Sequence, residues 1–287
     1  MDFLNIRVRL LNKLKLLPFL NIETTIKVNN KVIKIPIDSS IGLTNLRLSE
    51  TWMTLLLIKM KPLFNKNFID IGVNLGQTLV KVYSVFDNIN YVGFEPNPIC
   101  FHYSKKLISV NSFKNCDVVP VGIGSKNEIL PLMFFSSDNS DQSATIIENF
   151  RPESAILKKE FVPIYNGDSV IQFLPSEKGA FLKIDVEGAE LEVVEGMLEW
   201  INEFRPIIII EVLPVYTIEN IFRLERQKKL SKILKNSNFV IARIIKDSNQ
   251  ITIEILKDFD INTKIENSDY LFFPKEKKDE INLIFNN

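Results

Sequence analysis

The sequence predicts an α/β fold in which a doubly wound, mostly parallel sheet carries helices on both faces. From residue 66 onward, short apolar stretches alternate with helical stretches. The run RPIIIIEVLP, at 205–214, is apolar at almost every position, as in a strand buried on both faces. The chain closes with the strand-like segments FVIARII, ITIEIL and DYLFFP, which predict antiparallel strands at the end of the sheet.

The first 62 residues are predicted to form an accessory cap before a catalytic domain at 63–287. The segment 1–20 mixes Arg and Lys with apolar residues, which argues against a signal peptide and favours a basic amphipathic helix. Such a helix would pack on the domain, contact a second copy of the chain in a homodimer, or bind the surface of an anionic membrane.

Two further elements are expected within this cap. The segments IETTIKV and KVIKIPI alternate apolar and polar residues on either side of Asn29-Asn30, which predicts a β-hairpin. Ser49 is expected to cap a helix from about Glu50 to Met60, which Pro62 follows.

The catalytic domain is predicted to alternate strands and helices in chain order. Strands are expected at 67–72, 90–96, 116–124, 130–135, 160–166, 180–186 and 205–214, with helices at 77–86, 98–111, 187–204 and 217–235. The polar segment 136–151, SSDNSDQSATIIENFR, interrupts this alternation. It is either a solvated loop or a lid over a substrate, because loops at the carboxyl ends of parallel strands carry binding sites.

Composition restricts the class of protein. The 287 residues contain 35 Lys plus Arg and 35 Asp plus Glu, and this balance argues against a nucleic-acid binder. Cys100 and Cys116 form no CxxC pair, so a reducing compartment such as the cytoplasm is expected. No apolar run is long enough to span a membrane.

The stretch FIDIGVNLGQT, from Phe68 to Thr78, combines a strand, a glycine turn and the start of a helix. Glycine lets a ligand approach the backbone, and the first N–H groups of a helix have no partner within the helix. The stretch therefore predicts a loop that binds a nucleotide-type cofactor. It matches neither GxGxxG nor the P-loop pattern.

Two further clusters carry ionisable side chains at predicted strand ends. Glu95 follows Asp70 by 25 residues, at a position suited to accept hydrogen bonds from ribose hydroxyls and to repel a 2′-phosphate. In FLKIDVEG, Lys183 and Asp185 share one face of a strand, and Glu187 is expected to open the next helix. Charges beside an apolar strand are costly unless they are paired or functional.

The motifs FIDIGVNLGQT, VGFEPNP, LKIDVEGAELEVVEGM and RPIIIIEV, in this order, resemble the FkbM family of S-adenosylmethionine-dependent methyltransferases. The resemblance covers about 66–214 and implies a Rossmann-like class I methyltransferase fold with a seven-stranded sheet. It implies S-adenosyl-L-methionine as the cofactor and S-adenosyl-L-homocysteine as its product.

The resemblance also implies roles for single residues. The cofactor's methionine part would bind the loop, its ribose Glu95, and its adenine the region between the loop after Glu95 and the third strand. The residues concerned are Asp70, Gly72, Asn74, Gly76, Gln77, Glu95, Pro96, Asn97, Gly122, Ile123 and Asp185. Lys183, Asp185 and Glu187 would lie near the transferred methyl group and the acceptor.

A hydroxyl acceptor needs a general base or a metal ion to lose its proton. Asp185 is the first candidate for the base, Glu187 the second, and His102 a weaker third. Asp185 and Glu211 end successive parallel strands, so they are also candidate ligands for Mg²⁺, although a metal site is not favoured.

The expected reaction is O-methylation of a hydroxyl on a sugar or glycan precursor, with another small-molecule or N-methylated acceptor left open. The Lys-, Asn- and Ile-rich composition favours a bacterial source. An NAD-dependent nucleotide-sugar oxidoreductase and a non-catalytic cofactor-binding protein of the same fold remain alternatives. The identity of the acceptor lies outside the matched motifs.

Overall fold

The computed structural model describes residues 8, 10–11, 13–14, 16–17, 20–151, 153–217, 219–247, 250–259, 261 and 264–286. The amphipathic helix expected at 1–20 therefore falls largely outside the described residues. Within those residues, no helix combines the length and the apolar character needed to cross a membrane.

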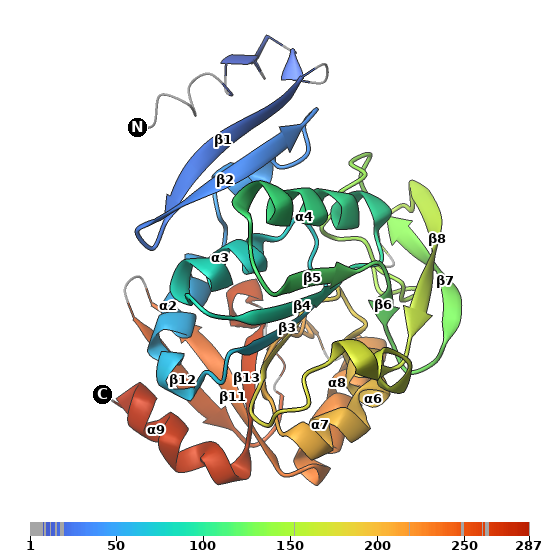
Figure 1. Cartoon of the computed structure of the whole chain (residues 1–287). Coiled ribbons are helices and arrows are strands. Elements are labelled where there is room, and N and C mark those ends of the chain that lie inside the picture. The colour runs from blue at the N-terminus through green and yellow to red at the C-terminus, as the bar shows by residue number, and fades with distance from the viewer. Residues whose placement is uncertain are drawn as a thin grey trace.

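Within the described residues, the main sheet has eight strands in the order β12-β11-β13-β10-β9-β3-β4-β5 (Figure 1). Their bounds are β3 Asn67–Ile71, β4 Asn90–Phe94, β5 Cys116–Val119, β9 Phe181–Ile184, β10 Ile207–Glu211, β11 Phe239–Lys246, β12 Ile251–Leu256 and β13 Asp269–Pro274. The five neighbouring strands β5, β4, β3, β9 and β10 are parallel to one another. Strand β13 is antiparallel to both β10 and β11. The predicted doubly wound sheet is confirmed. It exceeds the expected seven strands because β12 pairs with the outer edge of β11.

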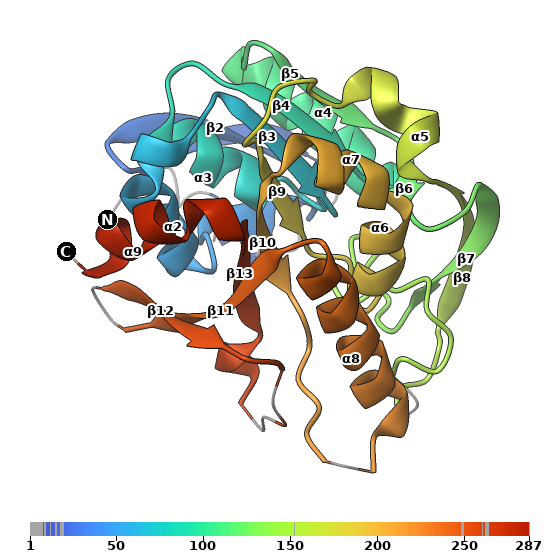
Figure 2. The same ribbon diagram turned by 90° about the horizontal axis from the view of Figure 1, so that it is seen from below.

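Helices cover both faces of this sheet, as predicted (Figures 1 and 2). One face packs against α2 Thr51–Lys59, α3 Gln77–Val85, α4 Pro98–Asn111 and α9 Lys278–Asn286. The other packs against α5 Gly167–Val170, α6 Glu190–Gly196, α7 Leu198–Phe204 and α8 Ile221–Asn236. Each strand therefore contributes apolar residues to two cores. In β3, Phe68 belongs to the first core and Ile69 to the second, because successive side chains point to opposite faces.

The strand predicted at 116–124 is wrong in its extent, because it consists of two strands in different sheets. Pro120 lies between β5 and β6 Gly122–Ile123, and proline has no N–H to continue a ladder. Strand β6 belongs to a second sheet in which β8 Lys158–Tyr165 lies between β6 and β7 Glu128–Phe134. This second sheet lies beside the main sheet (Figure 1). Residues of its strands form one wall of the site described below.

The single helix expected at 187–204 is also wrong, since two helices, α6 and α7, meet at Met197. Glu187 does not open the first of them, because α6 begins at Glu190 and Glu187 has a left-handed φ of 52°. Gly188 follows with a φ of 110°. Residues 187 and 188 thus form a turn between β9 and α6 rather than a helix start, and this turn directs Glu187 toward the site.

The hairpin predicted around Asn29-Asn30 is confirmed as β1 Asn21–Val28 and β2 Lys31–Asp38. Both Asn residues have positive φ, which suits the two-residue hairpin turn. The hairpin shares an apolar core with α4, where the Tyr103 hydroxyl donates to the carbonyl of Pro36. The division of the chain at residue 62 stays a prediction.

Ser49 does not cap α2, contrary to prediction. The N-cap is Glu50, which has a left-handed φ of 51°. The Ser49 hydroxyl donates instead to Oε1 of Gln77, 2.6 Å away, at the start of α3. This bond brings the segment before α2 to the carboxyl ends of the central strands.

Candidate functional site

A cleft of about 250 Å³ lies where the parallel strands β3, β4, β9 and β10 end. This is the edge at which open α/β sheets bind ligands. The cleft is lined by twelve of the residues singled out from the sequence: Gly72, Asn74, Gln77, Glu95, Pro96, Asn97, Gly122, Ile123, Lys183, Asp185, Glu187 and Glu211. Asp70, Gly76 and His102 do not line it, and His102 is exposed on α4.

The turn after β3 depends on residues that accept positive φ. Gly72 has a φ of 90° and Asn74 a φ of 48°. Asparagine tolerates this left-handed conformation better than most residues, and the Asn74 Oδ1 accepts a hydrogen bond from the N–H of Leu75. Gly76 is the N-cap of α3, with a φ of 74°, so it shapes the turn without touching the cleft.

Asp70 lies beneath this turn and is completely buried. The Tyr91 hydroxyl donates to one of its oxygens, and the Lys183 Nζ lies 4.0 Å from the other, Oδ1, which has no hydrogen-bond partner among the described residues. Burial raises the pKa of Asp70 to about 6, against the opposing charge of Lys183. Asp70 therefore does not face the cleft itself, but its carboxyl lies next to Tyr91 and Lys183.

Glu95 is fixed at the end of β4 by two backbone groups. Its Oε2 accepts from the N–H of Asn74 at 2.7 Å, and its Oε1 accepts from the N–H of Asn97 at 2.8 Å. Burial nevertheless raises its pKa to about 7, and these two N–H groups oppose the shift. Each carboxylate oxygen keeps a lone pair for a further donor in the cleft.

The wall beside Glu95 is largely apolar. Pro96 and Ile123 face the cleft together with Leu132 of β7 and Ile164 of β8. A Cβ at Gly122 would lie 2.5 Å from the Cδ1 of Ile164, so a larger residue at this position would displace the end of the Ile164 side chain. This wall suits a flat, weakly polar group next to the carboxylate of Glu95.

Lys183 and Asp185 form an ion pair at the end of β9, with Nζ and Oδ2 2.8 Å apart. Burial tends to raise the pKa of Asp185, but the ammonium of Lys183 outweighs it and leaves this pKa below its ordinary value. The pKa of Lys183 is raised, since Asp185 and Asp70 offset the effect of its burial. Both side chains are therefore charged at neutral pH.

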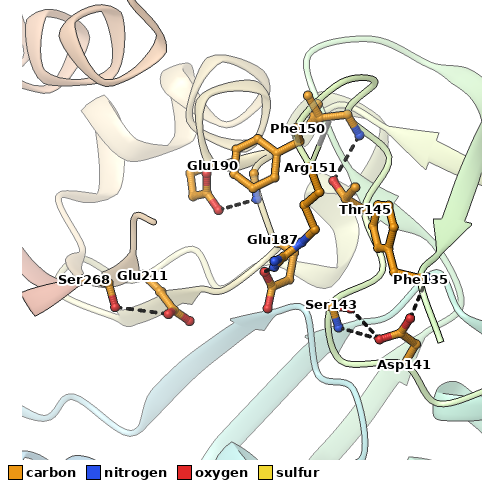
Figure 3. A network of polar contacts seen from close by, with 12 residues as sticks. Phe135, Asp141, Ser143, Thr145, Phe150, Arg151, Glu187, Glu190, Glu211 and Ser268 are labelled. Atoms are coloured by element: carbon orange, nitrogen blue, oxygen red, sulfur yellow. Dashed lines mark hydrogen bonds and ion pairs between the residues drawn. The ribbon is translucent and has the colours of Figure 1, made fainter. Parts of the chain in front are cut away.

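Glu187 is held by Arg151, whose Nη2 donates to its Oε2 at 2.6 Å (Figure 3). Burial raises the pKa of Glu187 to about 7, and the charge of Asp185 adds to the effect while Arg151 opposes it. A carboxyl with such a pKa changes between its acid and base forms near neutral pH. No motif in the sequence points to Arg151, although it ends the polar segment 136–151 that is predicted to be a loop or a lid.

Part of the polar segment 136–151 lines the cleft, and its role as a lid stays a prediction. Asp141 shapes it by accepting hydrogen bonds from the backbone N–H groups of Phe135, Ser136 and Ser143 (Figure 3). Asp141 and the neighbouring residues 142, 144 and 146 line the cleft. Phe150 closes over the turn at Gly188, where a Cβ would lie 2.7 Å from the Phe150 ring.

Ser49 and Glu50 also line the cleft, a position that no sequence motif predicts for them. Glu50 Oε2 lies 3.0 Å from Nζ of the completely buried Lys81. A lysine within an apolar helical run, as at Lys81 in QTLVKVYSV, is the one signal in the sequence that an acidic partner exists. Which acidic residue is the partner of Lys81 depends on tertiary contacts.

Glu211 ends β10 and accepts from the Ser268 hydroxyl at 3.1 Å (Figure 3). Burial and the charges of Asp185 and Asp269 raise its pKa to about 9. Among the described residues, no three His, Cys, Asp or Glu side chains are grouped to hold a metal ion. The two predicted ligands, Asp185 and Glu211, are thus an ion-paired carboxylate and a carboxyl whose pKa is raised by burial and by its acidic neighbours.

Comparison with known proteins shows to which family the chain belongs. The profile of the methyltransferase FkbM domain matches residues 70–241. The chain is 26% identical over 178 residues to the hexuronic acid methyltransferase AglP of Haloferax volcanii, a match that covers 61% of this chain and 69% of that protein. It is 26% identical over 161 residues to the methyltransferase sdnD of Sordaria araneosa, covering 47% of this chain and 61% of that one.

Solved structures with a similar arrangement were also found. One is methyltransferase FkbM from Methylobacillus flagellatus KT, with 14% identity and a TM-score of 0.43 over 72% of this chain and 43% of that chain. Another is the O-methyltransferase from Bacillus cereus in complex with S-adenosylhomocysteine, with 12% identity and a TM-score of 0.44 over 78% of this chain and 80% of that chain.

Proposed function

The chain belongs to the FkbM methyltransferase family, and we propose that it uses S-adenosyl-L-methionine to methylate a hydroxyl of a sugar or glycan precursor. The observation that carries this proposal is the position of Glu95. Its carboxylate is fixed by two backbone N–H groups and faces the same cleft as Lys183, Asp185 and Glu187. A site for a ribose and a set of acid–base groups therefore share one enclosed space.

The residues of the cleft fit this cofactor. Glu95 has free lone pairs for two ribose hydroxyls, and Pro96 and Ile123 offer an apolar wall to an adenine. The turn from Gly72 to Asn74 brings the backbone close to the methionine part, with Gln77 opening the helix behind it. The bound cofactor supplies an electrophilic methyl group on a sulfonium.

The task left to the chain is to orient the acceptor and remove its proton. Asp185 is a weak base, since Lys183 keeps its pKa low. Glu187, with a pKa of about 7, is better matched to proton removal near neutral pH, so we place the general base there and give Lys183 and Asp185 a positioning role. This reverses the order expected from the sequence.

Two observations favour a hydroxyl-bearing acceptor. Glu50, Glu187 and Glu211 line the cleft away from the apolar wall, and carboxyl oxygens accept hydrogen bonds from hydroxyls. The relative from Haloferax volcanii is named as a methyltransferase of a hexuronic acid, which is itself a sugar derivative. A sugar or glycan precursor is thus the acceptor that we propose.

The rival functions are less well supported. Membership of a methyltransferase family counts against an NAD-dependent oxidoreductase. A non-catalytic cofactor-binding protein would have no need of a partly buried carboxyl with a pKa of about 7 in the same cleft as Glu95. The homodimer, the peripheral membrane contact, the bacterial source and the cytoplasmic location remain predictions from the sequence.

A calorimetric comparison tests the cofactor. S-adenosylhomocysteine should bind the purified chain and NAD should not, and the reverse result would overturn the proposal. Methyl transfer is then followed with S-adenosylmethionine labelled in its methyl group and a set of glycan precursors. Transfer to an amine in place of a hydroxyl would refute the O-methylation.

A further inference from the structure

The segment 42–50 joins the hairpin to α2 and contacts the turn between β3 and α3, where we place the methionine part of the cofactor. It begins at Gly42, whose φ of 93° is left-handed, and continues as a short 3₁₀-helix, Leu43–Leu46. A Cβ at Gly42 would lie 2.4 Å from both the carbonyl oxygen of Pro36 and the hydroxyl of Tyr103. The segment is therefore packed directly against β2 and α4 where it begins.

The first contact with the turn is made by Asn45, which is completely buried. Its Nδ2 donates to the carbonyl oxygen of Leu75 at 2.6 Å and lies 3.4 Å from the Tyr103 hydroxyl. Its Oδ1 has no hydrogen-bond partner among the described residues. An unpaired buried oxygen costs stability, and an apolar side chain of the same shape would avoid that cost. What asparagine contributes at this position is therefore its donor to the turn.

The second contact is made by Ser49, whose hydroxyl and backbone N–H both donate to Oε1 of Gln77, at 2.6 and 3.2 Å. Because a backbone N–H can only donate, this atom of the amide must be the oxygen. The Nε2 is then the part of the amide that can donate to a ligand, and Gln77 lines the cleft. Ser49 therefore fixes which way the amide of Gln77 is turned.

The two contacts hold the half of the turn that leads into α3. In the first half, the carbonyl of Asn74 accepts from the Ser104 hydroxyl of α4 at 2.8 Å. The bonds from the segment 42–50 reach the second half, at Leu75 and Gln77, where α3 begins. The first N–H groups of a helix have no partner within it, so the direction of this first helical turn sets where they point.

From these contacts we infer that Asn45 and Ser49 are positioning residues for the cofactor. Asn45 acts through the backbone of Leu75, and Ser49 acts through the amide of Gln77. The segment before α2 thus completes the cofactor site, although Asn45 and Leu75 are 30 residues apart in the chain. The effect on the cofactor rests on the proposed function, whereas the hold on the turn does not.

Hydrogen–deuterium exchange of the full chain, without any ligand, tests the hold on the turn. Asn45→Leu keeps the approximate shape of the side chain without its donor, and Ser49→Ala removes the hydroxyl at an exposed position. Because each variant loses a hydrogen bond that opposes local opening, the amides of 72–78 should exchange about fivefold faster than in the wild type. Unchanged exchange would overturn the inference, and the exposed Ser49 permits this result even if the buried variant does not fold.

Asn111→Ala is the matched control, since Asn111 also ties the hairpin to the rest of the chain. Its side chain bonds to the N–H and the carbonyl of Lys34, both at 2.8 Å, and to Leu107 within α4. It should leave the exchange of 72–78 unchanged. Acceleration equal to that in Asn45→Leu would show that any loosening of the hairpin opens the turn, which would contradict a specific role of Asn45.

Calorimetry with S-adenosylhomocysteine tests the effect on the cofactor. The affinity should fall about fivefold in Asn45→Leu and in Ser49→Ala, and stay within about twofold of the wild type in Asn111→Ala. Ser49→Thr keeps the hydroxyl and should bind like the wild type, whereas a merely structural role would lower melting temperatures and leave the affinity unchanged. Faster exchange of 72–78 with full affinity would refute the positioning role. Absence of binding by the wild type would refute the proposed cofactor and leave the exchange result standing.

Discussion

Gly72 lies directly against the backbone carbonyl of Asp185, and a Cβ built at residue 72 would come within 1.9 Å of that oxygen. The contact joins the ends of β3 and β9, where Asp185 also donates its N–H to the carbonyl of Ile71 at 3.0 Å. The turn that we assign to the cofactor and the residues that we assign to the acceptor are thus parts of one backbone junction. A change at Gly72 must disturb both.

The first prediction is that Gly72→Ala weakens cofactor binding. An alanine would meet both the clash with Asp185 and the strain of a φ of 90°, so the turn must move. We expect the affinity for S-adenosylhomocysteine, measured by calorimetry, to fall by at least tenfold and the melting temperature to drop.

Gly179→Ala is the matched control. Its φ of 80° imposes a similar backbone strain, but the nearest atoms to a Cβ there are 4.0 Å away. It should lose about 1 kcal/mol of stability and no affinity for the ligand. Equal binding by Gly72→Ala and Gly179→Ala would show that the junction is not needed for the cofactor.

The second prediction concerns Glu95 and pH. Its pKa is about 7 in the free protein, and hydrogen bonds from ribose hydroxyls favour its ionised form, so binding should lower this pKa. Affinity for S-adenosylhomocysteine should therefore fall as the pH drops from 8 to 6, by at most about tenfold per pH unit. Calorimetry in buffers of different ionisation enthalpy should detect proton release on binding.

Glu95→Gln gives the complementary result. It should weaken binding at pH 8 and remove most of the pH dependence, while Glu203→Gln, at an exposed position of α7, should change neither. If binding by Glu95→Gln keeps the full pH dependence of the wild type, another group is the one that titrates.

The sequence predicts the residues of the cofactor half of the cleft better than the contacts of the acceptor half. The cofactor half follows from local signals, because Gly72 and Asn74 need positive φ and Glu95 ends a strand that the alternation of apolar residues predicts. The parallel sheet then brings those ends together.

The acceptor half depends on contacts that no local pattern encodes. Arg151 reaches Glu187 across 36 residues of chain, and Glu50 meets Lys81 across 31. The pKa order of Asp185 and Glu187 also results from which cation each one finds in the folded chain. The sequence therefore identified these carboxyls, and our proposal ranks them as bases in the opposite order to the one expected from the sequence.

The third prediction assigns the general base. Glu187→Gln should lower kcat by about 10²- to 10⁴-fold while leaving the affinity for S-adenosylhomocysteine within a few-fold of the wild type. In the wild type, kcat should rise with pH and level off above about 7, since Glu187 must be ionised to accept a proton. A variant Glu187→Gln with full turnover, alongside an inactive Asp185→Asn, would return the role to Asp185.

The fourth prediction concerns Arg151, whose charge lowers the pKa of Glu187. Arg151→Leu should shift the acid limb of the kcat profile to higher pH, because the carboxylate loses its cationic partner. Arg151→Lys keeps the charge and should shift the limb less. Superimposable profiles for the wild type and Arg151→Leu would mean that the limb reports a different group.

The last prediction links Glu211 to stability. Its pKa is about 9 in the folded chain, against an ordinary value of 4.5. Between these values the folded state holds a proton that the unfolded state releases, so stability falls as the pH rises toward 9. The other carboxyls with raised pKa values, at about 6 to 7, have mostly ionised by pH 7.5, so Glu211 is the carboxyl that titrates in the folded chain from 7.5 to 9. The thiols of Cys100 and Cys116, whose pKa values are raised by burial, begin to ionise in this range only in the unfolded chain, and they do so equally in every variant. Over this range the melting temperature should fall less in Glu211→Gln than in the wild type or Glu203→Gln, and parallel curves would show that Glu211 is already ionised.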